Sequence, residues 1–133
     1  MAQARTLSDQ ELEQVLAYAA STKHGLRNQT ILLMTHWAGM RIGEVAAVRY
    51  GDVLASDGTI RSEVKLSATQ TKGSKSRVVL LSERMQSAIA KYIAQYPCVD
   101  LKKPLFKTLR ADGFTPNTLT HIVSGLYKQA GYD

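Results

Sequence analysis

Apolar residues recur at the spacing of an α-helix in several stretches of this chain, and most of these stretches begin with a residue that caps helices. The first follows a capping box that runs from Ser8 to Glu11, and the last follows Thr115, which precedes a proline. A third such stretch opens at Ser82. The pattern therefore predicts helices over residues 9–21, 29–37, 82–96 and 115–131, with residues 23–28 as a polar joint.

The apolar pattern is interrupted between residues 38 and 49, where a short additional helix is expected to end near residue 49. Gly39 can take backbone angles that are closed to other residues, so one helix can end there and another begin. Arg41 then lies at the first turn, where free N–H groups and the helix dipole favour an anion. Glu44 follows on the same helical face and is placed to hold the Arg41 side chain. The segment is either an anion-binding site or an Arg–Glu surface pair that caps a helix.

The periodicity changes after residue 58, where turn residues give way to short runs typical of strands. We predict three strands with a turn at residues 72–75 between the last two. Their expected ranges are 59–61, 64–71 and 76–81. The expected fold class is α+β and mainly α, with helices packed around a small three-stranded antiparallel sheet. Leu105 and Phe106 are expected to form a short buried anchor.

Length and charge narrow the possible functions. The 133 residues fit one domain, and a single cysteine, Cys98, excludes an internal disulfide and favours an intracellular protein. No signal peptide or membrane span is recognisable, so we expect a cytoplasmic protein without a membrane partner. Residues 1–60 hold 5 Lys/Arg and 6 Asp/Glu, whereas residues 61–133 hold 12 and 5. The basic second half favours an anionic partner, with nucleic acid as the first candidate, although many basic surfaces serve only solubility.

The predicted turn at residues 72–75 concentrates part of this charge. Lys72, Lys75 and Arg77 surround a Gly-Ser pair, which gives a hairpin tip with three positive charges. Such a tip is suited to contact phosphates or enter a nucleic-acid groove. The alternative is an edge hairpin whose charges only prevent aggregation. The three histidines show no shared spacing of metal ligands, and we assign no metal site.

Two segments together resemble the catalytic domain of tyrosine recombinases, the phage-integrase family. The sequence A-G-M-R-I-G-E-V at residues 38–45, followed by Y-G-D at 50–52, is similar to the first signature of that family. The sequence T-K-G-S-K-S-R at residues 71–77 resembles the hairpin that carries the catalytic lysine of the family. Both segments occur in the expected order, so residues 1–133 are interpreted as a partial tyrosine-recombinase catalytic domain.

The resemblance implies a role for each of these residues. Arg41 would bind the scissile DNA phosphate, and Glu44 would support the site. Lys72 would give a proton to the departing 5′ oxygen, with Lys75 as the competing candidate for that role. Lys75 and Arg77 would contact DNA. The implied reaction proceeds through a 3′-phosphotyrosine on duplex DNA, needs no cofactor, metal or small-molecule substrate, and is carried out by a tetramer of the parent enzyme.

The resemblance also implies that one part of the catalytic centre is not in this sequence. The second cluster of the family, an H-x-x-R segment followed by the nucleophilic tyrosine, should come after residues 127–131. None of the six tyrosines follows such a segment, and His121 has no arginine three residues later. We therefore expect an incomplete catalytic domain that is inactive alone. The alternatives are a non-catalytic DNA-binding or regulatory module derived from an integrase, and a basic nucleic-acid-binding protein unrelated to recombinases.

Overall fold

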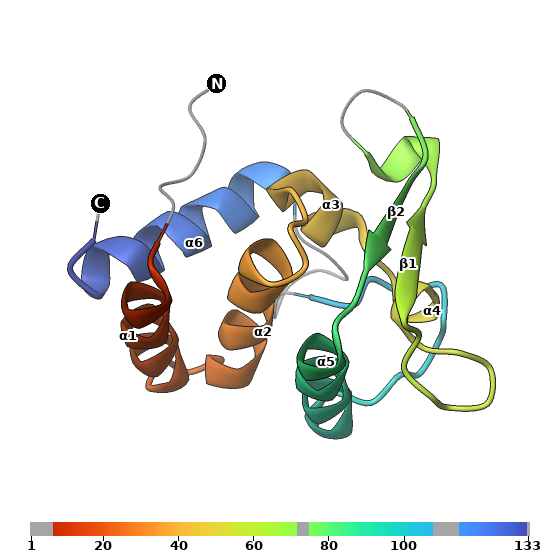
Figure 1. Ribbon diagram of the computed structural model, residues 1–133, viewed down its shortest axis with the longest axis horizontal. Coiled ribbons are helices and arrows are strands. Elements are labelled where there is room, and N and C mark those ends of the chain that lie inside the picture. The colour runs from red at the N-terminus through yellow and green to blue at the C-terminus, as the bar shows by residue number, and fades with distance from the viewer. Residues whose placement is uncertain (1–6, 72–74, 108–114, 133) are drawn as a thin grey trace.

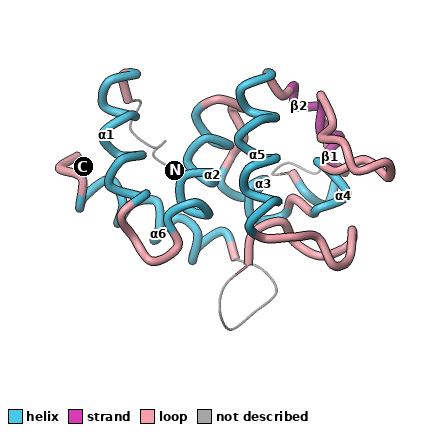
Figure 2. Tube along the Cα trace, turned by 90° about the horizontal axis from the view of Figure 1, so that it is seen from below, coloured by secondary structure: helices cyan, strands magenta, loops and turns pink. Residues whose placement is uncertain are grey.

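The structure is a computed structural model that describes residues 7–71, 75–107 and 115–132. Most described residues are helical, and a small antiparallel hairpin lies at one end of the molecule, opposite α1 and the C-terminal end of α6 (Figures 1 and 2). The fold is thus α+β and mainly α, as predicted. In chain order the elements are α1 (Asp9–Ala20), α2 (Gly25–His36), α3 (Ile42–Ala47), α4 (Tyr50–Val53), β1 (Glu63–Leu66), the 3-10 helix η1 (Ala68–Gln70), β2 (Arg77–Leu80), α5 (Glu83–Gln95) and α6 (Pro116–Gln129).

Helix α2 packs against α1, α3 and α5 and lies at the centre of the helical part. Its residues Ile31, Leu32 and Met34 are fully buried. In Figure 1, α3 lies between the helices and the hairpin, so the turn before α3 is shared by both parts. None of the helices in the described part of the chain is long and apolar enough to cross a membrane.

Helix α2 begins at Gly25, which corrects the prediction of a polar joint over residues 23–28. A Cβ atom at Gly25 would lie 2.6 Å from the carbonyl oxygen of Ala20, so glycine lets the two helices meet closely. The first turn also buries Arg27 and Asn28. The Arg27 guanidinium donates to the Asn28 side-chain oxygen at 3.0 and 3.1 Å, and this pairing allows both polar side chains to be buried. A pattern based on apolar spacing does not detect such a helix start.

The sheet has two strands among the described residues, where the sequence predicted three. Strands β1 and β2 are antiparallel, with Val64 opposite Val79. The expected first strand, residues 59–61, forms only a single bridge between Leu54 and Ile60. Strand β1 is also shorter than predicted, because residues 68–70 turn into the 3-10 helix η1.

The predicted anchor at Leu105 and Phe106 is confirmed, since both side chains are almost fully buried. The Tyr92 hydroxyl of α5 donates to the Leu105 carbonyl at 2.8 Å, and the two aromatic rings of Tyr92 and Phe106 pack 5.1 Å apart. The segment that contains the anchor also hydrogen-bonds to the stretch between α3 and α4, because the Leu105 N–H donates to the Val48 carbonyl. The anchor therefore connects α5 to the region that follows Arg41.

The C-terminal end of α2 is joined to α6 by a side-chain hydrogen bond between His36 Nε2 and the Tyr127 hydroxyl, at 2.7 Å. Burial lowers the pKa of His36 and raises the pKa of Tyr127. Both shifts favour the neutral side chains, and the imidazole tautomer decides which of the two groups donates. This contact fixes the last turn of α2 shortly before the chain reaches Gly39 and Arg41.

The lowered pKa of His36 predicts how stability depends on pH. Because the folded-state pKa lies below the value of about 6.5 for a free imidazole, the unfolded chain binds this proton first as the pH falls. The contribution of His36 to the free energy of unfolding is fully present above pH 6.5 and is lost on acidification. Denaturant unfolding between pH 7.5 and 5 should show a smaller loss of stability in His36→Gln than in the unaltered chain. The same change at the exposed His121 is the control, and an equal loss in His36→Gln would refute the prediction.

Candidate functional site

The turn between α2 and α3 presents Arg41, as the sequence predicts. Gly39 has a φ of 68°, and the N–H of Met40 donates to the Met34 carbonyl at 3.1 Å. The backbone therefore changes direction at Gly39 while Met40 stays hydrogen-bonded to the last turns of α2. Met40 is buried in the core. Arg41 is then the extended N-cap residue of α3. We call residues 37–41 the α2–α3 turn.

The Arg41 guanidinium is exposed and makes no hydrogen bond or ion pair with any residue that the structure describes. The contact between Arg41 and Glu44 runs through the backbone, because the N–H of Arg41 donates to Glu44 Oε1 at 3.0 Å. This arrangement differs from the predicted one, in which Glu44 holds the Arg41 side chain. A carboxylate at the third helical position satisfies the N-cap N–H and leaves the guanidinium available for a ligand.

The side chain that pairs with Glu44 is Arg77 of β2. Its Nη2 donates to Glu44 Oε1 at 3.0 Å and to the Gly39 carbonyl at 3.0 Å. Its Nε lies 2.9 Å from Glu44 Oε2, a charge contact without the alignment of a hydrogen bond. The Glu44 side chain is fully buried, whereas that of Arg77 is 39% exposed. A buried carboxylate requires such a cation, so this ion pair ties β2 to the α2–α3 turn.

A second carboxylate fixes the other arm of the hairpin in a similar way. Asp52 Oδ2 accepts from the N–H of Arg49, the N-cap residue of α4, at 2.8 Å. The same oxygen accepts from Nε2 of Gln70 at 2.8 Å, and Gln70 Nε2 also donates to the Ala47 carbonyl at 3.0 Å. Both arms of the hairpin are thus held by a carboxylate in the first turn of a short helix. The short helix that was predicted to end near residue 49 is α3, which ends at Ala47. A further helix, α4, follows from Tyr50, with Val48 extended between the two.

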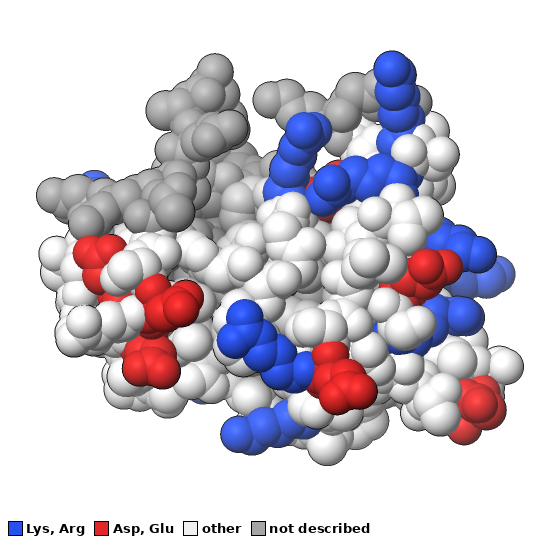
Figure 3. Space-filling view, in the orientation of Figure 1, with Lys and Arg blue, Asp and Glu red and all other residues white. Residues whose placement is uncertain are grey.

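The hairpin tip is only partly described. Lys72 lies outside the described residues. Lys75 is exposed, and its carbonyl accepts a hydrogen bond from the Thr71 hydroxyl. In Figure 3, Lys and Arg side chains gather over the end of the hairpin and the start of α3, while Asp and Glu gather over α1. The two parts of the surface therefore differ in charge, as the uneven distribution along the sequence indicates.

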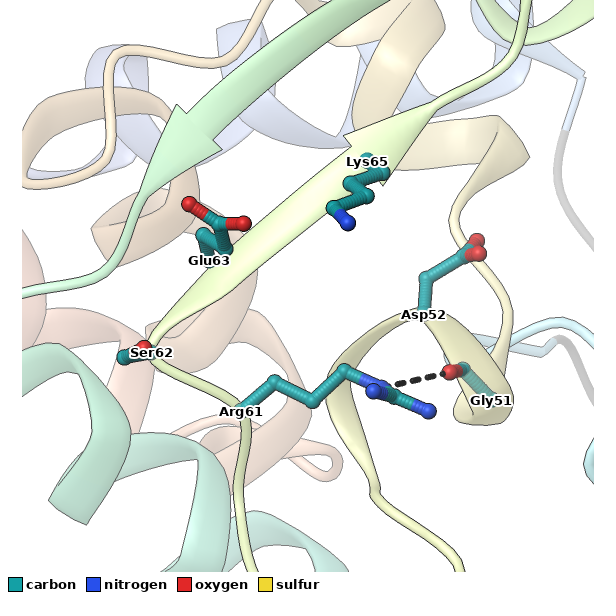
Figure 4. A pocket seen from close by; sticks show the side chains of 6 residues that line it. All are labelled: Gly51, Asp52, Arg61, Ser62, Glu63 and Lys65. Carbon is teal, nitrogen blue, oxygen red and sulfur yellow. Dashed lines mark hydrogen bonds between the residues drawn. The ribbon is translucent and has the colours of Figure 1, made fainter.

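A hollow of about 370 Å³ lies beside β1 and α4 (Figure 4). Arg61 closes one side by donating from Nε to the Gly51 carbonyl at 3.1 Å. The lining of the hollow combines cations and carboxylates and contains no apolar side chain. It consists of Gly51, Asp52, Arg61, Ser62, Glu63 and Lys65. Such a composition is not typical of a small-molecule site, which is usually mostly apolar. Within the described ranges, no three His, Cys, Asp or Glu side chains are grouped as metal ligands.

Three of the tyrosines are buried with their hydroxyl groups hydrogen-bonded inside the protein. Tyr50 donates to the Tyr96 carbonyl, Tyr92 donates to the Leu105 carbonyl, and Tyr127 contacts His36. Burial raises the pKa of each of these three hydroxyls. A buried phenol with a raised pKa is poorly suited to attack a phosphate of duplex DNA.

The matched family model is that of the phage integrase family, over residues 5–133. The chain belongs to this family. Tyrosine recombinase XerD of Oceanobacillus iheyensis is 26% identical over 130 residues, which cover 94% of this chain and 41% of that protein. Transposase A from transposon Tn554 of Staphylococcus aureus is 29% identical over 94 residues, which cover 68% of this chain and 25% of that protein.

A solved structure, described as the crystal structure of XerA recombinase, has the same fold. The TM-score is 0.71 at 24% sequence identity, and the match covers 98% of this chain and 44% of that chain. The chain therefore spans less than half the length of these relatives. The family is the one that the two sequence segments at residues 38–52 and 71–77 indicate.

The backbone of Gly39 gives a direct test of the α2–α3 turn. A Cβ at Gly39 would meet nothing within 4 Å, so Gly39→Ala should cost only the left-handed backbone strain, about 1–2 kcal/mol of unfolding free energy. Gly43 also has open space, but it lies inside α3, so Gly43→Ala should raise stability by up to about 1 kcal/mol. Chemical denaturation of both variants measures the difference. Equal changes in the two variants would show that the turn does not require a positive φ.

Proposed function

We propose that this chain forms one part of the catalytic domain of a site-specific DNA recombinase. In the proposed reaction a tyrosine hydroxyl attacks the scissile phosphorus, the 5′ oxygen leaves with a proton, and a 3′-phosphotyrosine forms. Exchange with a 5′ hydroxyl of a partner strand then restores the phosphodiester and releases the tyrosine. The observation that carries the proposal is the exposed Arg41 guanidinium, which has no partner in the described part of the chain and is held at a helix N-terminus.

Each site residue has a separate role in this proposal. Arg41 binds the scissile phosphate and stabilises the charge that builds on it in the transition state. Lys72 is the general acid for the 5′ oxygen, and Lys75 contacts the DNA backbone. Glu44 holds the backbone of Arg41. The nucleophilic tyrosine and the second arginine come from a segment that follows these residues, so the chain alone does not cleave DNA, and the parent enzyme works as a tetramer on duplex DNA.

The second candidate is a DNA-binding or regulatory module that keeps the fold but performs no catalysis. The basic surface near the hairpin supports this function equally well. An H-x-x-R segment and a tyrosine that follow in the parent reading frame would favour the enzyme.

The DNA-binding part of the proposal predicts weak, salt-dependent affinity for duplex DNA with little sequence preference. A plot of log K against log salt concentration should be linear with a negative slope, because phosphate contacts release counterions. Arg41→Ala should reduce that slope by roughly 0.9 if it removes one phosphate contact. His121→Ala, a substitution on the exposed face of α6, is the control. Binding that does not respond to salt would contradict the proposal.

The roles of Arg41 and Lys72 can be separated in a protein extended by the H-x-x-R and tyrosine segment. Arg41→Ala should lower the cleavage rate by about 100- to 1000-fold, because a charged donor to the transition state is lost. Lys72→Ala should also lower the cleavage rate. A DNA substrate with a 5′-bridging sulfur should restore the cleavage rate of this variant, since sulfur leaves without a proton. The same substrate should not rescue Arg41→Ala.

Two results would contradict these assignments. Rescue of Lys75→Ala in place of Lys72→Ala would assign the proton transfer to Lys75. A covalent protein–DNA adduct formed by the unextended chain on a nicked substrate would show that a tyrosine in the present sequence is the nucleophile.

A further inference from the structure

Arg77 is a basic residue of the hairpin whose side chain lies against the α2–α3 turn. In the antiparallel register Arg77 lies opposite Leu66, on the same face of the sheet as the buried Val79. The intervening Val78 points to the opposite face and is 53% exposed. The strand alternation therefore directs Arg77 toward the helices, although its charge alone suggests a surface residue.

The guanidinium of Arg77 contacts one residue before Arg41 in the sequence and one residue after it. One end of the fork binds the Gly39 carbonyl, two residues before Arg41, and the fork also binds the carboxylate of Glu44, three residues after it. The oxygen of Glu44 that accepts from Arg77 is the one that accepts from the Arg41 N–H. The planar fork of an arginine can make these contacts together, whereas a lysine ammonium cannot reproduce the geometry.

We propose that Arg77 is a positioning residue, which fixes the backbone from Gly39 to Glu44 and thereby aims the Arg41 side chain. This role rests on the proposed function, in which Arg41 binds a DNA phosphate. It replaces the assignment of Arg77 as a DNA contact. Lys75 remains the DNA-contacting residue of this arm.

The local structure cannot fix Arg41 by itself. Helix α3 has six residues, and so short a helix is unstable without tertiary contacts. Arg41 is the N-cap residue, and its side chain has no described partner to hold it. The orientation of Arg41 therefore depends on Glu44, and the buried Glu44 depends on the cation that β2 supplies.

Amide hydrogen exchange of Arg41, measured by NMR, tests without DNA whether Arg77 holds the Arg41 backbone. Arg77→Ala should speed the exchange of the Arg41 amide by about tenfold or more relative to core amides of α2, because its acceptor is no longer held in place. The double variant Arg77→Ala/Glu44→Gln removes the unpaired buried charge and should show the same local loosening if the single variant unfolds. Lys75→Ala removes one positive charge from the same arm and should leave the Arg41 amide unchanged.

DNA affinity gives the second readout, through a double-mutant cycle. If Arg77 acts through Arg41, Arg41→Ala should weaken binding little further in the Arg77→Ala background, whereas it should have its full effect in the Lys75→Ala background. Arg77→Lys keeps the charge and loses the fork, so it should behave like Arg77→Ala. Rescue by Arg77→Lys, or effects of Arg41→Ala and Arg77→Ala that multiply, would identify Arg77 as an independent DNA contact and overturn the proposal.

The two readouts distinguish the positioning role of Arg77 from the proposed function. If the Arg41 amide stays protected in Arg77→Ala, the positioning role is refuted, whatever the chain binds. A chain that binds no duplex DNA at low salt refutes the proposed function, while the exchange experiment still decides whether Arg77 holds the Arg41 backbone.

Discussion

The buried carboxylate of Glu44 is the interaction on which the site depends. It satisfies the N-cap N–H of α3, and its ion pair with Arg77 joins β2 to the turn that carries Arg41. An ionised carboxylate without partners would be too costly to bury, so the helix start and the strand must be in place together. The α2–α3 turn and the hairpin, more than thirty residues apart in sequence, consequently form one structural unit.

Asp52 extends the same principle to the other arm of the hairpin. It accepts from the N-cap N–H of α4 and from the Gln70 side chain, which follows β1. Neither α3 nor α4 is long enough to be stable alone, and the two-stranded sheet is also marginal by itself. Each of these small elements is held by a side chain from another, and the buried α2 and the Leu105–Phe106 anchor hold them against the core.

The sequence predicted the parts that local rules determine. The capped helices α1, α5 and α6 and the break at Gly39 follow from capping residues and apolar spacing, and the structure has them. The start of α2 was missed because it buries the polar pair Arg27 and Asn28, which apolar periodicity cannot indicate. The strand at residues 59–61 was overpredicted, because this segment forms only the single bridge of Ile60 to Leu54. The partner of Glu44 was misassigned, since helical spacing indicates a neighbour in sequence and says nothing of a strand that arrives later in the chain.

The actual partner of Glu44 has a chemical consequence for the site. Had Glu44 paired with the guanidinium of Arg41, its negative charge would compete directly with any anionic ligand for the same donors. By pairing with Arg77 and accepting only the backbone N–H of Arg41, Glu44 positions Arg41 without neutralising it. One arginine is thereby used to compensate a buried charge, and the second keeps its exposed donors at the N-terminus of α3, where the helix dipole has the same sign. Arg41 is thus held by its backbone, and its guanidinium has no partner among the described residues.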